Sequence, residues 1–129
     1  MDPKSFTIQQ RKVDNLIVAK KYLAAYEQIR NLLHQYEENL TGEQVHYLLN
    51  LQSNTKYAAE AQVILNIIGE LNPQPTKGTR VSREDIQKQA IAQGGEFQWT
   101  NAEFERTIDY VILHDLLPAH LEENEIVFD

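Results

Sequence analysis

The chain has 129 residues, of which 42% are hydrophobic and 24% are charged, a composition typical of a folded domain rather than a disordered segment. It contains no cysteine, which excludes disulfides and thiolate metal sites. No apolar run reaches the roughly 18–20 residues that a membrane span requires, and the first residues lack the apolar core of a signal peptide, so we expect a cytoplasmic protein that does not enter a membrane.

The formal net charge of −7 is unevenly distributed. Residues 1–72 carry seven Lys or Arg against eight acids, whereas residues 73–129 carry five against eleven. No Lys or Arg follows Arg106. The sequence therefore predicts an acidic C-terminal half.

The first helical segment is expected over residues 7–39, where Thr7 and Gln10 fit a capping box. An apolar pattern over residues 22–40 repeats with alternating spacings of four and three, which resembles a coiled coil. One interpretation is a single helix about 45 Å long that projects and pairs with a second copy of the chain. The other is a break near Tyr26 that leaves two core helices. Under the first, the interface candidates are Tyr22, Tyr26, Ile29, Leu33 and Tyr36.

A second helical region is expected between residues 41 and 71. Thr41 and Gln44 fit another capping box, and a short apolar segment follows up to Leu51. The run Ser53-Asn54-Thr55 predicts an interruption and a new cap. The next helix, over residues 55–71, carries the clearest apolar stripe and is expected in the core: Tyr57, Ala61, Ile64, Leu65, Ile68 and Leu71.

The segment from residue 72 to 81 is rich in Pro and Gly and predicts a loop. Ser82, followed three residues later by Asp85, predicts the start of another helix, and Gly94-Gly95 predicts its end. A short extended piece over residues 96–99 then leads to the next helix.

Residues 100–117 contain the signals of a complete helix. Thr100 and Glu103 form a capping box, and Pro118 predicts the stop near Leu117. One apolar stripe follows the cap: Phe104, Ile108, Val111 and Ile112. The tail after Pro118 predicts two short strands joined by a turn at Glu123-Asn124.

The pattern S-R-E-D-I, the Gly-Gly break, T-N-A-E-F-E-R-T-I-D-Y-V-I-L and the hairpin E-E-N-E-I-V-F resembles winged helix-turn-helix domains in general. Because residues 73–129 alone are too few to bury a core, the helix over 55–71 is assigned to the same unit. The predicted fold is mainly α, with a helical N-terminal arm or hairpin over residues 1–52. A winged-helix-like three-helix body over residues 53–129 follows, with its Pro/Gly-rich loop at 72–81 and a short β-hairpin at its end. The resemblance implies either DNA binding or protein docking.

No catalytic constellation is visible. The histidines His34, His46, His114 and His120 lack metal-ligand spacing, although the last two, with Asp115 and Glu122, could converge if the hairpin folded back. There is no P-loop and no nucleophile motif. Gly94–Phe97 resembles part of the signature of cyclic-dinucleotide synthases, but one acid is missing, and a double-glycine helix stop explains it better. We therefore expect no catalytic residue, cofactor or metal, and no enzyme activity.

The charge of the last helix argues against DNA. Its positions off the apolar stripe are Glu103, Glu105, Arg106, Asp109, Tyr110 and His114, and the hairpin adds further acids. Such a surface repels a polyanion, because affinity for DNA rises with the number of phosphates that Lys and Arg neutralise. If the protein does bind DNA, the candidate residues are Lys77, Arg80, Arg83, Lys88 and Arg106.

The favoured hypothesis is a non-enzymatic interaction, adaptor or inhibitor protein that forms a homodimer through its N-terminal arm, with tyrosines as interface anchors. Its acidic surface would meet a protein partner, for which a basic or nucleic-acid-binding protein is the candidate. The acidic surface candidates are Glu103, Asp109, Glu122, Glu123 and Glu125. An inhibitor that imitates nucleic acid is one variety of this hypothesis. The alternative is a dimeric winged helix-turn-helix DNA-binding transcription regulator.

Overall fold

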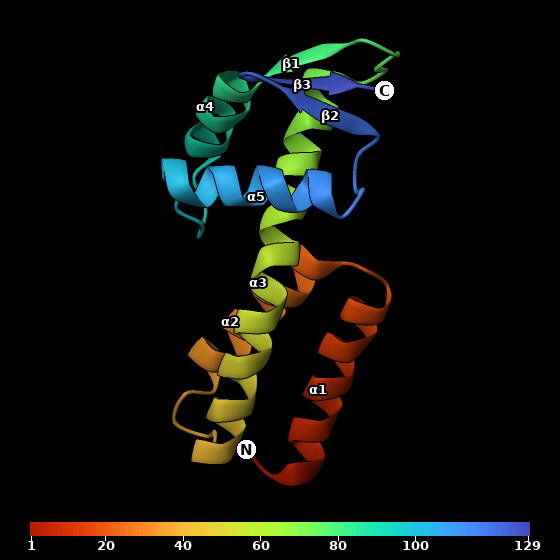
Figure 1. The fold of residues 1–129 in the computed structure, drawn as a ribbon. Helices are drawn as coiled ribbons and strands as arrows, with labels where there is room; N and C mark the ends of the chain where they lie inside the picture. The colour runs from red at the N-terminus through yellow and green to blue at the C-terminus, as the bar shows by residue number, and fades with distance from the viewer. The chain divides into compact units, whose positions relative to one another are not determined.

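The computed structural model describes residues 1–129. The chain is mainly helical, with five α-helices and a small three-stranded antiparallel sheet near the C-terminus (Figure 1), which confirms the predicted fold class at this level. None of the helices combines the length and the apolar character that crossing a bilayer requires. The chain divides into two compact units, Met1–Ala59 and Glu60–Asp129. The seam inferred from the sequence was placed near Gln52.

The first unit contains α1 (Pro3–Val18), α2 (Tyr22–Gln35) and the first part of α3 (Gly42–Leu71). Helix α1 begins four residues before the expected Thr7. The side chain of Asp2 caps it by accepting a hydrogen bond from the Ser5 backbone N–H at 3.0 Å, and Pro3 occupies the first turn, where no N–H partner is needed.

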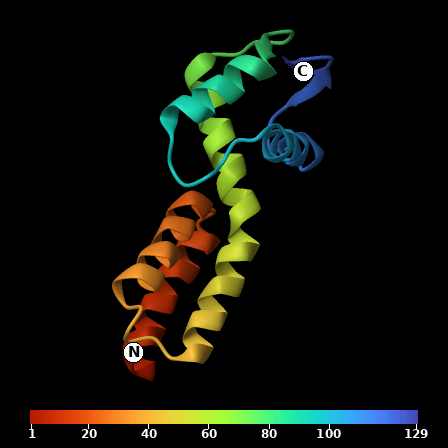
Figure 2. The same cartoon turned by 90° about the vertical axis from the view of Figure 1, so that its left-hand side faces the viewer.

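The expected long helix over residues 7–39 is divided. Lys20 adopts φ 60° between α1 and α2, and the two helices lie side by side (Figures 1 and 2). The interpretation of a single projecting helix is therefore wrong, and the break falls a few residues before Tyr26. The buried core of this unit is Val13, Ala25, Ile29, Leu32 and Leu48.

Helix α3 is continuous over 30 residues, so the predicted interruption at Ser53–Thr55 is wrong. Thr55 does not cap a new helix; its hydroxyl donates to the Leu51 carbonyl one turn earlier, and the side chain is buried. The start of the helix was predicted correctly. Thr41 and Gln44 form a reciprocal capping box with bonds of 3.0 and 3.1 Å.

The second unit contains the end of α3, then β1 (Arg80–Ser82), α4 (Arg83–Gln93), α5 (Asn101–Leu113), β2 (Ala119–Glu122) and β3 (Glu125–Phe128). Helix α5 crosses the C-terminal part of α3 (Figure 1). The strand order is β1-β3-β2, with Val81 opposite Ile126 and Leu121 opposite the same residue from the other side. Strand β1 was not predicted. The buried core contains Ile64, Ile67, Ile68, Val81, Ile86, Ala90, Trp99, Phe104, Ile108, Ile126 and Phe128.

The predicted caps of α4 and α5 are confirmed. Ser82 accepts from the Asp85 N–H at 3.4 Å, and Thr100 accepts from the Glu103 N–H at 3.3 Å. Helix α5 nevertheless ends at Leu113, four residues before the expected stop. The chain turns there through Asp115, whose φ is 51°.

Candidate interaction surface

The outer face of the sheet carries a chain of charged groups. Alternation along the strands turns Val81, Leu121 and Ile126 into the core and places Arg80 and His120 on the opposite face, on either side of Val127. Val127 is only 5% exposed although it lies on this outer face. We infer that the long side chains of its two cross-strand neighbours cover it.

These groups are connected by ion pairs across all three strands. The Arg80 guanidinium lies 2.8 Å from Glu122 Oε2 and 3.5 Å from Glu125 Oε1. His120 Nε2 lies 3.2 Å from Glu122 Oε1, and its Nδ1 lies 2.5 Å from Asp129 Oδ1. Both ring nitrogens of His120 therefore face a carboxylate, an arrangement that favours the doubly protonated imidazolium.

The carboxylates change the titration of this face. The hydrogen bonds from His120 to Asp129 and then to Glu122 raise the pKa of His120 above its ordinary value of 6.5. The pKa of Glu122 is lowered, first by the hydrogen bond from His120 and then by that from Arg80. Because these groups are exposed to solvent, the pairs are screened and contribute little stability individually.

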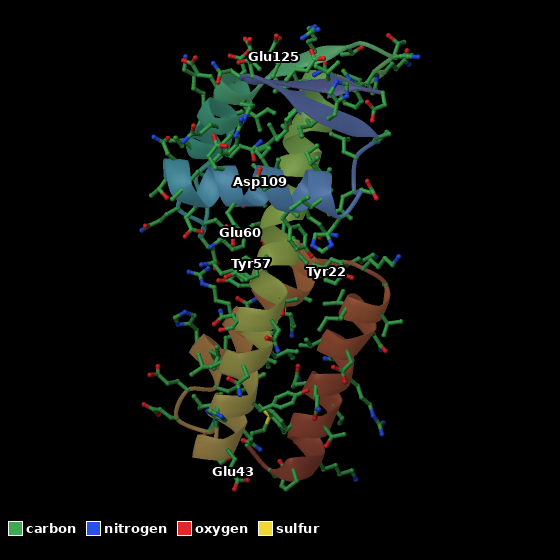
Figure 3. All side chains as sticks on the ribbon, in the orientation of Figure 1. Tyr22, Glu43, Tyr57, Glu60, Asp109 and Glu125 are labelled. Carbon is green, nitrogen blue, oxygen red and sulfur yellow. The ribbon has the colours of Figure 1, made fainter.

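A second charge network joins α5 to α3. Arg106 forms ion pairs with Glu103, three residues earlier on α5, and with Glu60 on α3, at 3.3 Å. Glu60 is 1% exposed, and Figure 3 shows it on α3 beside α5. A buried carboxylate requires a partner, so Arg106 has a structural role where α5 crosses α3.

Arg83 holds the hairpin turn against α4 and α5. Its backbone N–H donates to the Asn124 carbonyl at 2.9 Å, and its guanidinium donates to the Glu123 carbonyl at 3.3 Å. The same guanidinium is paired with Glu105 on α5, and the side chain is only 17% exposed. Arg83 is therefore a packing residue of the second unit and presents little charge to solvent.

The remaining basic candidates lie at the surface. Lys88 is paired with Glu84 one turn earlier at 3.0 Å, and the hydrogen bond with that carboxylate raises the pKa of Lys88. Lys77 is exposed in the loop before β1 and forms no ion pair. Of the five residues predicted as nucleic-acid candidates, four are thus already bound to carboxylates of the same unit.

The acidic candidates fall into two groups. Glu103, Glu122 and Glu125 are each paired with an arginine. Asp109, labelled on α5 in Figure 3, and Glu123, at φ 51° in the hairpin turn, are exposed and form no ion pair. The second unit, Glu60–Asp129, carries thirteen acids against five Lys or Arg, a net charge of −8.

The predicted interface residues all lie on or next to α2. Ile29 is fully buried in the core of the first unit, and Leu33 and Tyr36 pack partly against that core. Tyr22 and Tyr26 are half-buried. The prediction assumed that the three tyrosines were exposed, and the structure places each of them at intermediate exposure because α2 packs within the unit.

Sequence reasoning missed two features. The sequence analysis did not predict that Glu60 is buried. A single acid within the alanine-rich stretch 58–61 could have indicated it. The exposure of Leu113, the last residue of α5, was not predicted: its side chain is 79% exposed. No group of three His, Asp or Glu side chains is arranged to hold a metal ion. The ring of His114, which the sequence analysis grouped with Asp115, His120 and Glu122, lies against Tyr110 with ring centroids 4.3 Å apart.

One open hollow of about 510 Å³ lies in the first unit, between the start of α1 and the end of α2. Its lining is mainly polar: Met1, Asp2, Ser5, Gln9, Tyr36 and Asn39. The Asp2 carboxylate is already used as the α1 cap, and the Ser5 N–H lowers its pKa. The one carboxylate that lines the hollow is therefore already engaged by the backbone of α1.

No family model matches the chain, and no similar curated protein or solved structure was found.

Proposed function

We propose that residues 60–129 form a winged-helix-type module. The support is the order of the elements, helix, strand, helix, helix, strand and strand from α3 to β3, together with the sheet order β1-β3-β2. In this assignment α5 takes the position of the recognition helix, and the turn between β2 and β3 is the wing.

We further propose that this module is a non-enzymatic binding surface for a basic protein partner rather than for DNA. The observation that carries this proposal is the pairing of Arg80, Arg83, Lys88 and Arg106 with carboxylates of their own unit. To contact a phosphate, each of these four cations would have to break its ion pair with a carboxylate. Helix α5 would also bring the negative charge of Asp109 toward the DNA. A cationic partner is instead attracted to the second unit, whose net charge of −8 also steers its approach.

The second candidate function is a DNA-binding regulator. The element order favours it, since α5 is placed as a recognition helix would be. Its cationic contacts would start from Lys77 and Arg80, near the start of β1. Such binding would fall steeply with salt.

The deciding experiment is a pair of anisotropy titrations at low ionic strength, one with labelled random duplex DNA and one with a labelled oligo-arginine peptide. We expect no DNA retention and salt-sensitive binding of the peptide. Neutralising the unpaired acids with Asp109→Asn and Glu123→Gln should weaken peptide binding. The matched control, Glu37→Gln with Glu38→Gln in the first unit, should leave it unchanged.

If the protein binds the duplex DNA and the Lys77→Ala and Arg80→Ala variant does not, the proposed binding of a basic protein is wrong and the DNA-binding regulator is favoured. Arg83 is left intact in this test because its removal would also release the hairpin turn.

A further inference from the structure

The outer face of α1 carries a stripe of cationic and apolar side chains. At about 100° per residue, positions 4, 8, 11, 15 and 18 fall within one narrow sector of the helix, opposite the buried Val13. These positions are Lys4, Ile8, Arg11, Asn15 and Val18, and all five are exposed. Ile8 is 51% exposed and Val18 is 82% exposed. Neither Lys4 nor Arg11 forms an ion pair, so both charges are available to a partner.

The outer face of α5 carries the opposite combination. Asp109 and Leu113, one turn apart, point away from the buried Phe104 and Ile108. Leu113 is 79% exposed, and Leu116, just beyond the end of the helix, is 44% exposed. Asp109 forms no ion pair, and Asp115 adds a second exposed acid beside the two leucines.

The two stripes match in chemistry. Val18 and Leu113 are the two most exposed large apolar side chains in the protein. The α1 stripe carries Lys4 and Arg11, with the exposed Asp14 just outside it one turn before Val18, and the α5 stripe carries Asp109. Burying them against each other would remove apolar surface from water and bring Arg11 and Lys4 toward acids that have no partner. The α1 stripe thus offers cations to the unpaired acid of the α5 stripe, and each stripe offers apolar surface to the other.

We propose that a second copy of this chain docks its α1 stripe on the α5 stripe of the first. Pairing of α5 with α5 would bring Asp109 against its own copy, and pairing of α1 with α1 would do the same for Arg11, so like charges oppose both symmetric alternatives. The contact joins two different surfaces and is heterologous. This proposal rests on the proposed function: the cationic surface that the acidic unit binds is the α1 stripe of a second copy, in a unit with seven Lys or Arg against six acids.

The test uses the full chain and two charge reversals. Arg11→Glu places an acid on the α1 stripe, and Asp109→Arg places a cation on the α5 stripe. We expect the unmodified protein to associate in light scattering at low salt. Each variant alone should associate at least about tenfold more weakly, because a like-charge contact replaces an attractive one. Mixing the two variants should restore association, since the acid introduced on the α1 stripe of one chain then faces the cation introduced on the α5 stripe of the other.

Two further sets of variants separate this contact from general charge effects. Glu38→Arg and Lys77→Glu change the net charge by the same amounts but lie off both stripes, so they should associate as the unmodified protein does. Val18→Ser and Leu113→Ser should weaken association at both low and high salt, because they remove apolar contact and leave the charge unchanged. Both residues are so exposed that folding should be unaffected, which circular dichroism checks.

A monomeric mass at low salt, or a mixture of the two charge variants that stays monomeric, would overturn the proposal. Binding of the oligo-arginine peptide to a protein that remains monomeric would leave the proposed function standing and remove only the second copy as its partner. If neither the peptide binds nor the chain associates, both proposals fail together.

Discussion

Residues 1–59 and residues 60–129 are folded units of similar size that use charge differently. The first carries seven Lys or Arg against six acids and buries Val13, Ile29 and Leu48 between helices. The second carries five against thirteen, and all four of its paired cations hold acids within the fold. Four of the five cations of the second unit are thus paired with its own acids, and Lys77 is not, whereas Lys4 and Arg11 of α1 form no ion pair. Positive charge without an acidic partner therefore lies on α1 and, in the second unit, at Lys77.

The largest effect should come from the apolar core of the first unit. Ile29→Ala is expected to lower the free energy of unfolding by about 2–5 kcal/mol, because the fully buried side chain leaves a cavity. Urea denaturation followed by circular dichroism measures it. Leu33→Ala, at a half-buried position on the same helix, is the control and should cost clearly less. Equal costs at the two positions would mean that α2 is not packed as described.

The next largest effect on the free energy of unfolding is expected at Glu60, the buried carboxylate of the second unit. Glu60→Ala should cost about 1–3 kcal/mol, since it removes a buried partner of Arg106, which keeps partial access to water. Replacing both residues by leucine should bring the unfolding free energy back to within about 1 kcal/mol of the original. Glu103→Ala, which removes only the partly exposed partner, is the matched control and should cost about 0.5 kcal/mol.

Smaller effects are expected at the helix caps of the second unit. Thr100→Ala and Ser82→Ala should each lower the free energy of unfolding by about 1 kcal/mol, because each exposes an unpaired N–H of the first helical turn. Thr100→Ser retains the hydroxyl and should change thermal stability little. A loss with serine as large as that with alanine would show that the methyl group of Thr100, and not the cap, is what matters.

The smallest effect is a pH dependence of the sheet face. The folded pKa of His120 is raised above 6.5, so its contribution to stability is fully present below that pH and is lost as pH rises through the raised pKa. The folded pKa of Glu122 is lowered below 4.5, so its contribution is present above pH 4.5 and is lost as pH falls through the lowered pKa. Both act together between these limits.

Urea midpoints measured across this range should therefore decline on either side of it. His120→Gln should remove the decline at the alkaline side and leave the rest of the profile in place. An unchanged alkaline decline in this variant would assign it to another group.

The elements with local signals were predictable from sequence. The cap at Thr100 follows from a side-chain oxygen that accepts a backbone N–H, and the stop at Gly94 follows from the freedom of glycine to adopt a positive φ. The turn at Glu123-Asn124 lies where the sequence pattern places it. The break at Lys20 carries no such signal, because a left-handed lysine is selected by the packing of α1 on α2. Ser53–Thr55 gave a false signal, since Thr55 can also bond back within a continuous helix.

The candidate surface was predictable in composition but not in its connections. The excess of acids over Lys and Arg could be counted in the sequence, and the cations could be identified there. Which acid each cation contacts depends on residues as far apart as Glu60 and Arg106 or Arg80 and Glu125, which only the folded topology brings together. Strand β1 was missed for the same reason, because three residues become a strand only when β3 is present to pair with them.

The central position of β3 also has a consequence for how the protein is made. The second unit cannot complete its sheet until Ile126 and Phe128 have left the ribosome, whereas the core of the first unit is complete once Leu51 has emerged. At typical synthesis rates of about 5–20 residues per second, the first unit has roughly 4–15 s to fold alone. During that time the acidic unit is still an open chain, while the α1 stripe is already part of a folded unit.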